Sequence, residues 1–339
     1  MIELKTGSFE INKEGNVVLE GGVELNMGKE DFLCLKYLQS QALEILLVVD
    51  KFCEENKLTY YLGEGTLLGA IRHQGFIPWD DDIDILMPRE DYEKFLELGA
   101  KDLPEGFELD SSETNPNHWT ILSQVQMTQP SPYIKKRMEG IALNNGPAID
   151  IFPIDYVSSD SSRALAIRSR RIRALRRAMW IKSGVHNRDW YKTIFRRLKY
   201  YYPLKLFGKF KTLKQLRDQS HALMTKTNSD SDSAYATIFS SLYSLDRETF
   251  RREYFGEPIR ALFEGYMLPV PREYEKVLSI IYGDYMELPP VKNRKTKHYY
   301  SFEPESITKI KDKDVIEFVE YIKELRAQTE EELLEKGEG

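Results

Sequence analysis

Four aspartates lie within five positions of the segment GFIPWDDDIDILMP, which runs from residue 75 to residue 88. In a β-strand, alternate side chains share a face. A strand over DDIDILM therefore predicts that Asp80, Asp82 and Asp84 point one way while the isoleucines between them enter the core. Asp81 is expected on the other side, where it caps a turn or is solvated. Two carboxylates two positions apart on a rigid strand can bind one hard cation or a pair of cations.

The ligand type indicates which cation this would be. Clustered carboxylates with no His or Cys beside them favour Mg²⁺ or Mn²⁺ over Zn²⁺. The alternative is a solvated acidic turn at a strand end, which is the commoner explanation of an Asp-x-Asp match. The apolar residues that alternate with Asp82 and Asp84 favour a constrained strand. We therefore predict that these two aspartates bind Mg²⁺ or Mn²⁺.

Two further features supply what phosphoryl transfer needs. The turn GEGT (residues 63–66) opens the predicted helix TLLGAIR, and backbone N–H groups at a helix N-terminus bind phosphate oxygens. Asp150 lies between isoleucines on a predicted buried strand, where a carboxylate without a partner is costly. It is the candidate third ligand, or the base that accepts the proton of the attacking hydroxyl. Asp155 is expected to cap the following loop.

A framework of strands and helices must position these residues. Hydrophobic spacing predicts a small hairpin, a long amphipathic helix over 29–57, and short strands alternating with helices up to a strand at 147–157. The predicted fold class is α/β (α+β), a mixed sheet flanked by helices with an added basic helical region. The stretch TNSDSDSA (227–234) is the predicted linker. The predicted divisions are a hairpin at 1–28, a catalytic core at 29–158, a basic helical insertion at 159–234, a segment completing the site at 235–300, and a charged helix at 301–339.

Charge is unevenly distributed along the chain. The segment from Arg163 to Arg217 contains 18 lysines and arginines and one acidic residue, whereas the whole chain has a formal net charge of −6. Three interpretations stay open: a solvated helical exterior, contact with an anionic lipid-linked acceptor at a membrane surface, or nucleic-acid binding. No recognition motif accompanies the charge, so we predict no nucleic-acid partner.

No segment indicates export or membrane insertion. The first residues lack a basic flank followed by an apolar stretch, and no apolar run approaches about 18 residues. The two cysteines, Cys34 and Cys53, have neither the spacing of a zinc site nor that of a disulfide framework. We predict a cytoplasmic protein, with peripheral contact at the inner face of the plasma membrane as an open alternative.

The order of the motifs resembles the nucleotidyltransferase fold of the DNA polymerase beta superfamily: a glycine turn, an Asp-x-Asp strand, then a lone acid on a later strand. The individual residues of these motifs indicate one family within this superfamily. GTLLGAIRHQGFIPWDDDIDILMPREDYEKF and IDIFPID look like the LicD family of phosphocholine transferases, and FEGYMLPVPREYEKVLSIIYGDYMELPP is similar to its C-terminal stretch. The resemblance covers residues 57–157 and 260–298, and leaves out the hairpin and the basic helices.

The resemblance implies a CDP-alcohol donor, usually CDP-choline, and as acceptor a hydroxyl of a surface glycan such as lipopolysaccharide, or of a teichoic acid precursor. The acceptor oxygen attacks the phosphorus that bears the alcohol and expels CMP, with Mg²⁺ or Mn²⁺ as cofactor. Carried over to this chain, Asp82, Asp84 and Asp150 are the metal ligands and catalytic residues, Asp150 alternatively the general base. Gly65 and Thr66 contact the donor phosphates.

Several neighbouring residues have open roles. Arg72 either contacts a phosphate or pairs with the acid cluster, and Trp79 either covers a base or choline or packs in the core. His73 is expected at the surface or behind the ligands. The segment ILSQVQMTQPSPYI has Gln where relatives carry a basic residue, which leaves open the cation that pairs with the diphosphate. Further candidates for aromatic, ionic or phosphate contacts are Tyr282, Tyr285, Asp284, Arg294 and His298, and Lys135, Lys136 and Arg137 are substitute cations.

Three alternatives compete with the preferred prediction of an Mg-dependent LicD-type phosphotransferase. A small-molecule nucleotidyltransferase, for example one that modifies an antibiotic, would use ATP and release pyrophosphate. A glycosyltransferase with its own Asp-x-Asp would need neither the glycine turn nor Asp150. An inactive relative would serve as a binding module, which the intact Asp82, Asp84 and Asp150 disfavour.

Overall fold

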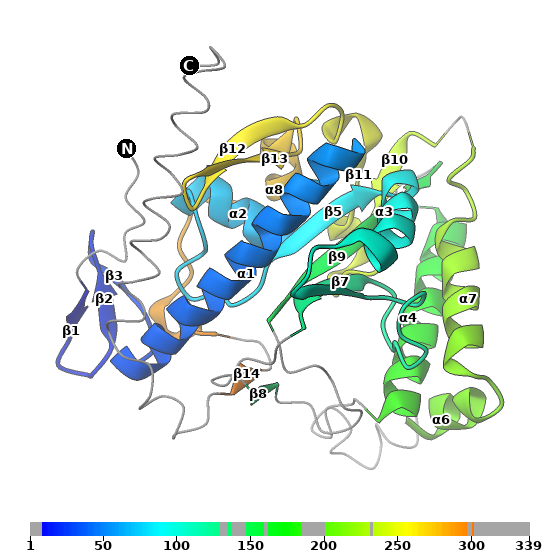
Figure 1. Ribbon diagram of the computed structural model, residues 1–339, viewed down its shortest axis with the longest axis horizontal. Helices are drawn as coiled ribbons and strands as arrows, with labels where there is room; N and C mark the ends of the chain where they lie inside the picture. Colours follow the sequence, from blue (N-terminus) through cyan, green and yellow to red (C-terminus); the bar gives the residue numbers. More distant parts are fainter. Residues whose placement is uncertain are drawn as a thin grey trace.

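A seven-stranded mixed sheet forms the core of the molecule (Figure 1). The computed structural model describes residues 9–128, 135–136, 147–158, 162–184, 201–230, 233–296 and 300–301. The strand order is β11-β10-β9-β5-β4, with β7 attached to β9 and β6 to β7. The strands are β4 (Tyr61–Leu62), β5 (Asp84–Pro88), β6 (Phe107–Asp110), β7 (Ser123–Met127), β9 (Ala148–Val157), β10 (Tyr235–Thr237) and β11 (Thr249–Arg251). The predicted α+β class is confirmed.

Strand β9 is the centre of this sheet. It pairs in parallel with β5 on one side. On its other side it pairs antiparallel with β7 along its first half and with β10 along its last three residues. Because β9 is central and α1 and α3 pack against it, its sequence AIDIFPIDYV is largely apolar, and Ile149 and Ile151 are fully buried. A charged residue on this strand is therefore an exception that needs a partner.

Helices α1 (Lys29–Asn56) and α3 (Arg89–Asp102) pack on the sheet and on each other. Phe52 of α1 and Phe95 of α3 meet edge to face with ring centroids 5.6 Å apart. At the β4 edge lie α2 (Glu64–His73), α8 (Tyr274–Tyr282) and the hairpin of β12 (Ile259–Phe263) and β13 (Tyr266–Val270) (Figure 1). The long helix predicted over 29–57 is thus confirmed to within one residue.

The N-terminal hairpin has a third strand. The small sheet contains β1 (Glu10–Ile11), β2 (Val17–Leu19) and β3 (Val23–Glu24), joined in that order. The remaining short elements are the strand pair β8 (Lys135–Lys136) and β14 (Tyr300–Ser301) and the 3₁₀ turns at Leu245–Arg247, Arg252–Tyr254 and Val291–Asn293. The charged helix predicted at 301–339 lies, apart from Ser301, outside the described residues.

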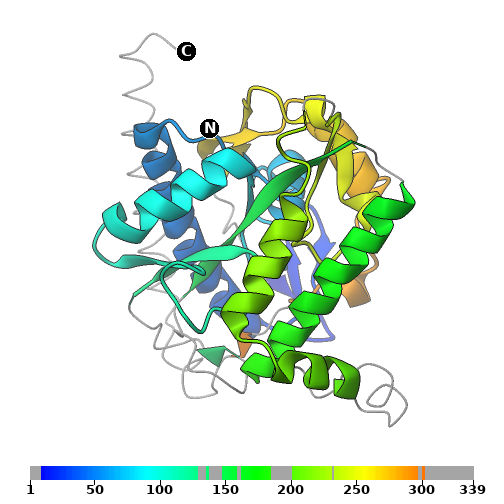
Figure 2. The same ribbon diagram turned by 90° about the vertical axis from the view of Figure 1, so that its right-hand side faces the viewer.

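Three helices of the basic region stand at one side of the sheet. They are α4 (Arg163–Ser183), α6 (Tyr202–Lys209) and α7 (Leu213–Met224). Helices α4 and α7 run side by side and α6 crosses their ends (Figure 2). Two arginines of α4 are buried and bind carbonyl groups: Arg176 donates to Ser240 O and Ser241 O at 2.8 and 2.9 Å, and Arg168 to Met224 O at 2.9 Å. Part of the basic charge is therefore structural rather than a solvated exterior.

The prediction of a linker at residues 227–234 is wrong. Thr227 Oγ1 donates to Tyr156 O at 2.7 Å, and Asn228 Nδ2 donates to Asp155 Oδ1 at 2.8 Å. The segment is a turn that returns the chain to the sheet, where β10 pairs with β9. Thr227 and Asn228 bind β9, whereas Ser229 and Asp230 are exposed, so the polar composition of the segment did not reveal that its first residues are tied to the sheet.

Asp155 was also predicted wrongly, as a cap. It is fully buried and forms a bidentate ion pair with Arg89, with Nε–Oδ1 at 2.9 Å and Nη2–Oδ2 at 2.8 Å. Strand β9 continues two residues past Asp155, so no loop begins there to be capped. The ion pair ties α3 to β9.

No helix in the described part of the chain has the length and apolarity to cross a bilayer.

Candidate active site

The clustered aspartates lie in two pieces of structure. Strand β5 begins at Asp84, so Asp80, Asp81 and Asp82 occupy the loop before it, and the predicted strand began three residues too early. The reason is the short β4, which ends at Leu62 and leaves that loop without a neighbouring strand on this side. Strand alternation is therefore not what gathers the acids. The loop does so: one oxygen from each of its three aspartates lies within 4.8 Å of the others.

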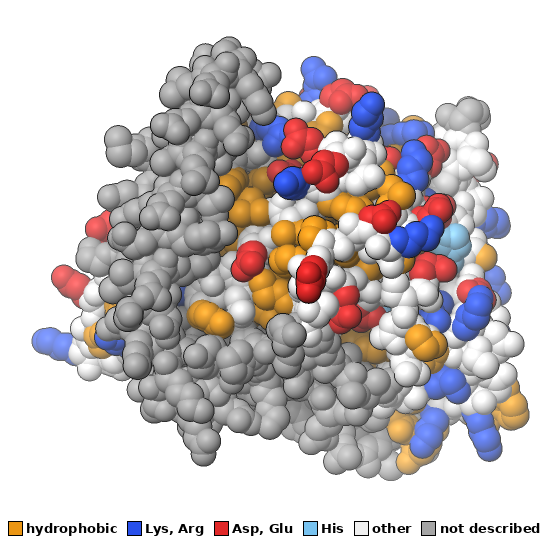
Figure 3. Space-filling view, viewed as in Figure 1, with side chains coloured by type: hydrophobic (Ala, Val, Ile, Leu, Met, Phe, Trp, Pro, Cys, Tyr) orange, Lys and Arg blue, Asp and Glu red, His pale blue; other side chains and the backbone are white. Residues whose placement is uncertain are grey.

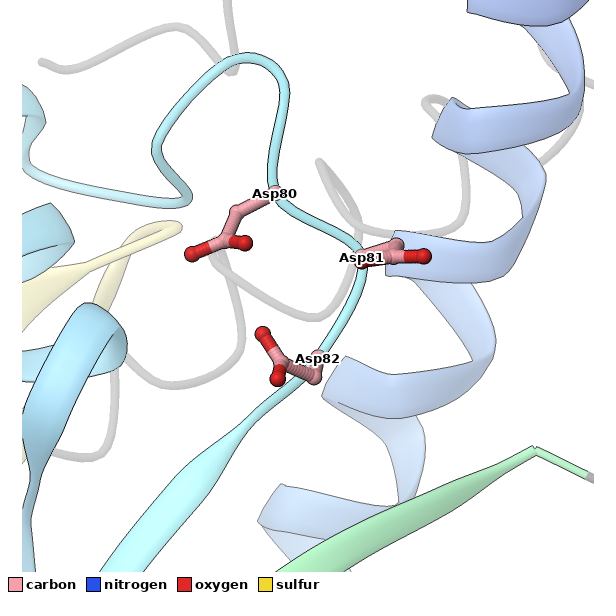
Figure 4. A group of neighbouring side chains, drawn as sticks. All are labelled: Asp80, Asp81 and Asp82. Atoms are coloured by element: carbon pink, nitrogen blue, oxygen red, sulfur yellow. The ribbon is translucent and has the colours of Figure 1, made fainter. Parts of the chain in front are cut away.

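The three loop aspartates differ in direction. The carboxylates of Asp80 and Asp82 point to the same side, whereas the side chain of Asp81 extends toward α1 (Figure 4). Asp81 is only 4% exposed, so the expectation that it is solvated is wrong. Asp80 and Asp82 keep the shared direction that the sequence predicted, although a loop provides it.

Asp84 and Asp150 are direct neighbours on adjacent parallel strands. They are Cα partners in the β5–β9 register, at the N-terminal ends of their described pairing. The N–H of Asp150 donates to Ile83 O at 2.9 Å, which fixes this register. Adjacent strands lie about 4.8 Å apart, so the fold brings two carboxylates that are distant in sequence within reach of one cation.

Gln124 on β7 orients Asp150 from the other side. It is the Cα partner of Asp150 in the β7–β9 register, and its Nε2 donates to Asp150 Oδ1 at 2.5 Å. Gln124 belongs to the segment that departs from the family resemblance. An amide donor here fixes the direction of the Asp150 carboxylate through one of its oxygens.

The turn at residues 63–66 faces the acids. Gly63 caps α2 without a side chain, and the N–H groups of the first helical turn have no acceptor within the helix. A Cβ atom on Gly65 would lie 2.7 Å from Asp80 Oδ2, so only glycine lets this carboxylate approach the turn. Thr66 Oγ1 accepts a hydrogen bond from Asp84 N–H at 2.8 Å. Thr66 therefore joins the turn to β5, and its hydroxyl proton remains available to a ligand oxygen.

Negative charge dominates this region. Burial raises the pKa of Asp84 well above its usual range, and the carboxylates of Asp82, Asp150, Glu64 and Asp80 raise it further. Each of these groups disfavours ionisation of the next in a poorly solvated place. A bound cation would remove the penalty. The group of three carboxylates whose oxygens lie close together, Asp80, Asp81 and Asp82, offers oxygen donors alone, which suits a hard ion such as Mg²⁺ or Mn²⁺.

Glu64 and Glu248 form a second carboxyl group pair that sequence reasoning missed. Glu248 Oε1 accepts from Ser241 Oγ at 2.7 Å, while its other oxygen and both Glu64 oxygens are buried without a well-formed hydrogen bond among the described residues. Burial raises the pKa of Glu64 to about 7. Burial, followed by the neighbouring Glu64 carboxylate, raises that of Glu248 well above its usual range. The sequence contains one indication of an unusual role for Glu64, its position between two glycines. The backbone φ angle of Glu64 is 44°, in the region that favours glycine.

Two residues that the sequence did not single out, Gln39 and Glu264, hold the acidic loop in place. Gln39 of α1 donates from Nε2 to Asp80 O at 2.7 Å. Glu264, in the turn between β12 and β13, accepts the N–H of Phe76 at 2.9 Å. The loop that carries Asp80 to Asp82 is thereby fixed to elements on both sides of it.

Arg72 is turned toward the C-terminal segment. Its Nη1 donates to Tyr285 O at 2.8 Å and to Glu287 O at 3.1 Å, and its Nε donates to His73 Nε2 at 2.9 Å. Among the described residues its hydrogen bonds go to this segment and to His73 rather than to the acids, and the predicted phosphate contact stays a prediction. His73 is partly buried, and burial, with the positive charge of Arg72, lowers its pKa to about 4.

Trp79 is buried in the main hydrophobic core, as the packing alternative predicts. The guanidinium of Arg294 lies 6.0 Å from its ring centroid, and Arg294 Nε donates to Pro289 O at 2.8 Å. Tyr282 lies near the acids, since Glu64 and Asp84 are among the charges that raise its pKa after burial. Of the other candidates, Arg137, His298 and the side chains of Lys135 and Lys136 lie outside the described residues.

Comparisons with known proteins identify the family. Residues 57–179 match the model of the LicD/FKTN/FKRP nucleotidyltransferase domain, a range that contains Asp82, Asp84 and Asp150. The chain is 30% identical over 273 residues to the lipopolysaccharide cholinephosphotransferase LicD of Haemophilus influenzae, which covers 77% of this chain and 96% of the relative. The chain belongs to the LicD family. The predicted recognition is thus confirmed.

The LicD family match extends well beyond the first motif. It includes β9 with Asp150 and most of α4. Two uncharacterised Rickettsia proteins match a short part only: that of R. typhi is 50% identical over 44 residues, 13% of this chain and 14% of its own length. That of R. prowazekii is 57% identical over 37 residues, 11% of this chain and 14% of its own length.

Proposed function

We propose that this LicD-family protein transfers phosphocholine from CDP-choline to a hydroxyl of lipopolysaccharide or of a teichoic acid precursor, releasing CMP. The observation that carries the proposal is the pairing of Asp84 with Asp150 beside the glycine turn. It occurs in a chain that is 30% identical to a lipopolysaccharide cholinephosphotransferase over nearly all of that relative. Choline is the first choice among alcohols because of that relative's name.

The proposed cofactor is Mg²⁺ or Mn²⁺, held by Asp82, Asp84 and Asp150. When bound, such a cation neutralises charge on the transferring phosphoryl group and on the departing CMP. Gly65 and Thr66 present N–H and hydroxyl groups to the donor phosphates. This mechanism does not need an imidazole as acid or base. The lowered pKa of His73 keeps its side chain neutral near pH 7.

Asp150 is the proposed acceptor of the proton from the attacking hydroxyl. Gln124 holds Asp150 Oδ1 at 2.5 Å, so the side chain has a fixed direction before substrate arrives. The acceptor oxygen forms a bond to the phosphorus that carries choline, the bond from this phosphorus to the bridging oxygen breaks, and CMP leaves with that oxygen. Positioning and charge compensation do most of the work in such reactions.

The test is an assay with CDP-choline labelled in its methyl groups, lipopolysaccharide lacking phosphocholine, and Mg²⁺. We expect label in the lipopolysaccharide and an equal amount of CMP, both abolished by EDTA and by Asp84→Asn. A parallel reaction with ATP tests ordinary nucleotidyl transfer, for which pyrophosphate would be the product. Pyrophosphate without CMP would overturn the proposal, and a teichoic acid precursor in place of lipopolysaccharide separates the two acceptors.

A further inference from the structure

Exposed apolar side chains gather at one end of the helical region. Ten large hydrophobic side chains are exposed among the described residues, and four of them belong to the nine residues 202–210, which we call the apolar tip. The exposed fractions are 49% for Tyr202, 60% for Leu206, 42% for Phe207 and 77% for Phe210. The tip consists of α6 and the residue after it. Scattered exposed apolar residues need no explanation, but such a concentration does.

Helix α6 presents its apolar side chains to solvent because its smallest residue faces the protein. Gly208 is the buried residue of α6, and a Cβ atom there would lie 3.7 Å from Ala178 O of α4. Lys182 Nζ reinforces this contact by donating to Gly208 O at 3.2 Å. Tyr202, Leu206 and Phe210 follow one another at a spacing of four and share a face. This is the reverse of an ordinary surface helix, whose apolar stripe faces the core.

The apolar tip is also basic. Lys205 and Lys209 are exposed within it, and Lys211 follows, with Nζ 5.0 Å from the ring centroid of Phe207. Neither residues 201–211 nor α4 contains an acidic residue. At the lower right of the molecule, where Figure 1 places α6, apolar and basic side chains share the surface (Figure 3). Positive charge around an apolar patch is complementary to an anionic, partly apolar surface.

We propose that the apolar tip inserts into the surface of an anionic lipid bilayer. Leu206, Phe207 and Phe210 enter the boundary between headgroups and acyl chains, while the lysines contact headgroup phosphates. Helices that lie in this boundary combine Phe, Leu and Trp on one face with Lys and Arg beside them. A single short helix binds weakly, so we expect reversible, salt-sensitive attachment.

The other partners fit the tip less well. A nucleic acid would use the lysines but would leave the aliphatic and aromatic side chains without a counterpart. A second copy of this chain, joined through the same face, would bring its Lys205 and Lys209 close to those of the first, where like charges repel. The proposal does not depend on the enzymatic function, although attachment would place the enzyme where lipid-linked acceptors occur.

Vesicle flotation of the full chain tests the proposal. The vesicles contain phosphatidylglycerol and phosphatidylcholine in equal parts, or phosphatidylcholine alone. We expect about tenfold more protein to float with the anionic vesicles at low salt, and the difference to disappear at high salt. Leu206→Ser with Phe210→Ser should lower the floating fraction about tenfold, and Lys205→Glu with Lys209→Glu should lower it at least as much.

The matched control removes exposed apolar side chains elsewhere. Ile259→Ser with Met267→Ser changes two exposed residues of the β12–β13 hairpin, and we expect unchanged flotation. Thermal melts establish that all three variants fold. Absence of flotation with anionic vesicles, equal flotation with neutral ones, or full binding by the Leu206/Phe210 variant would each overturn the proposal. A dimer in light scattering that the same variant abolishes would replace the membrane with a second copy as the partner.

Discussion

At the scale of single residues, the main feature is the cluster of carboxylates around Asp84. Its raised pKa means that the folded state holds a proton more tightly than the unfolded state does. In the absence of a cation, the charged form of Asp84 therefore destabilises the protein increasingly as pH rises above the ordinary carboxyl range. A site of this kind favours function at the expense of the stability of the metal-free protein.

We expect Asp84→Asn to separate these two effects. The variant should lose about a thousandfold in transfer rate. In EDTA at pH 7 its free energy of unfolding should rise by on the order of 1 kcal/mol, because the variant lacks the carboxyl group whose raised pKa makes folding less favourable as pH rises. Urea denaturation with EDTA and with Mg²⁺ provides the measurement. The matched control is Asp218→Asn, an exposed position on α7; lower stability of Asp84→Asn in EDTA would contradict the prediction.

Glu64 provides a second pH dependence. Its folded-state pKa of about 7 lies above its unfolded value, so its contribution is most favourable below about pH 4.5 and is lost as pH rises through 7. Glu64→Gln should flatten the loss of stability between pH 5 and 8 by on the order of 2 kcal/mol. Urea midpoints across this range measure it, with the exposed Glu54→Gln as control. An unchanged pH profile would show that Glu248 carries the titration instead.

At the scale of elements, the sequence predicted many of the helices and strands, but not the strand register or the side-chain contacts that join them. Periodicity located α1 and β9 to within one residue at each end, because both are long and strongly apolar on their buried sides. The start of β5 was missed because it depends on where β4 ends. The pairing of Asp84 with Asp150 depends on the register of parallel strands, which periodicity does not contain. The bonds from Gln124 and Glu264 are likewise contacts between segments remote in sequence.

The ion pair between Arg89 and Asp155 offers a test of element coupling. Both side chains are buried, so Asp155→Ala leaves a charge without a partner between α3 and β9. We expect the free energy of unfolding to fall by about 3–5 kcal/mol, as measured by urea denaturation. Asp218→Ala breaks the exposed pair with Lys214 and should cost at most about 1 kcal/mol. Equal effects of the two substitutions would mean that the buried pair does not join these elements.

At the scale of the whole molecule, the basic helices share apolar contacts with the sheet. One cluster of buried residues combines β9, α4 and α7, and Arg168 and Arg176 of α4 bind carbonyls outside that helix. These contacts predict one cooperative unfolding transition rather than a separately melting helical module.

Two single-tryptophan variants test this cooperativity. The fluorescence of Trp79 reports on the main hydrophobic core, and that of Trp180 reports on α4. We expect fluorescence from the two variants to give the same urea midpoint, matching that of far-UV circular dichroism. An earlier transition at Trp180 would indicate that the helices unfold on their own, and Arg176→Leu should produce that separation if the carbonyl contacts are the cause.

The path of the chain at the end of β9 has an engineering consequence. Val157 and Tyr235 are Cα partners on antiparallel strands, so the chain leaves the sheet and re-enters it at one place. Everything between them is topologically the loop of a β-hairpin, however long it has become. Such loops can be shortened, lengthened or exchanged without rethreading the sheet. A helical region exchanged between relatives would therefore keep the strand order of the sheet, provided that the buried contacts of α4 and α7 with the sheet were exchanged together with it.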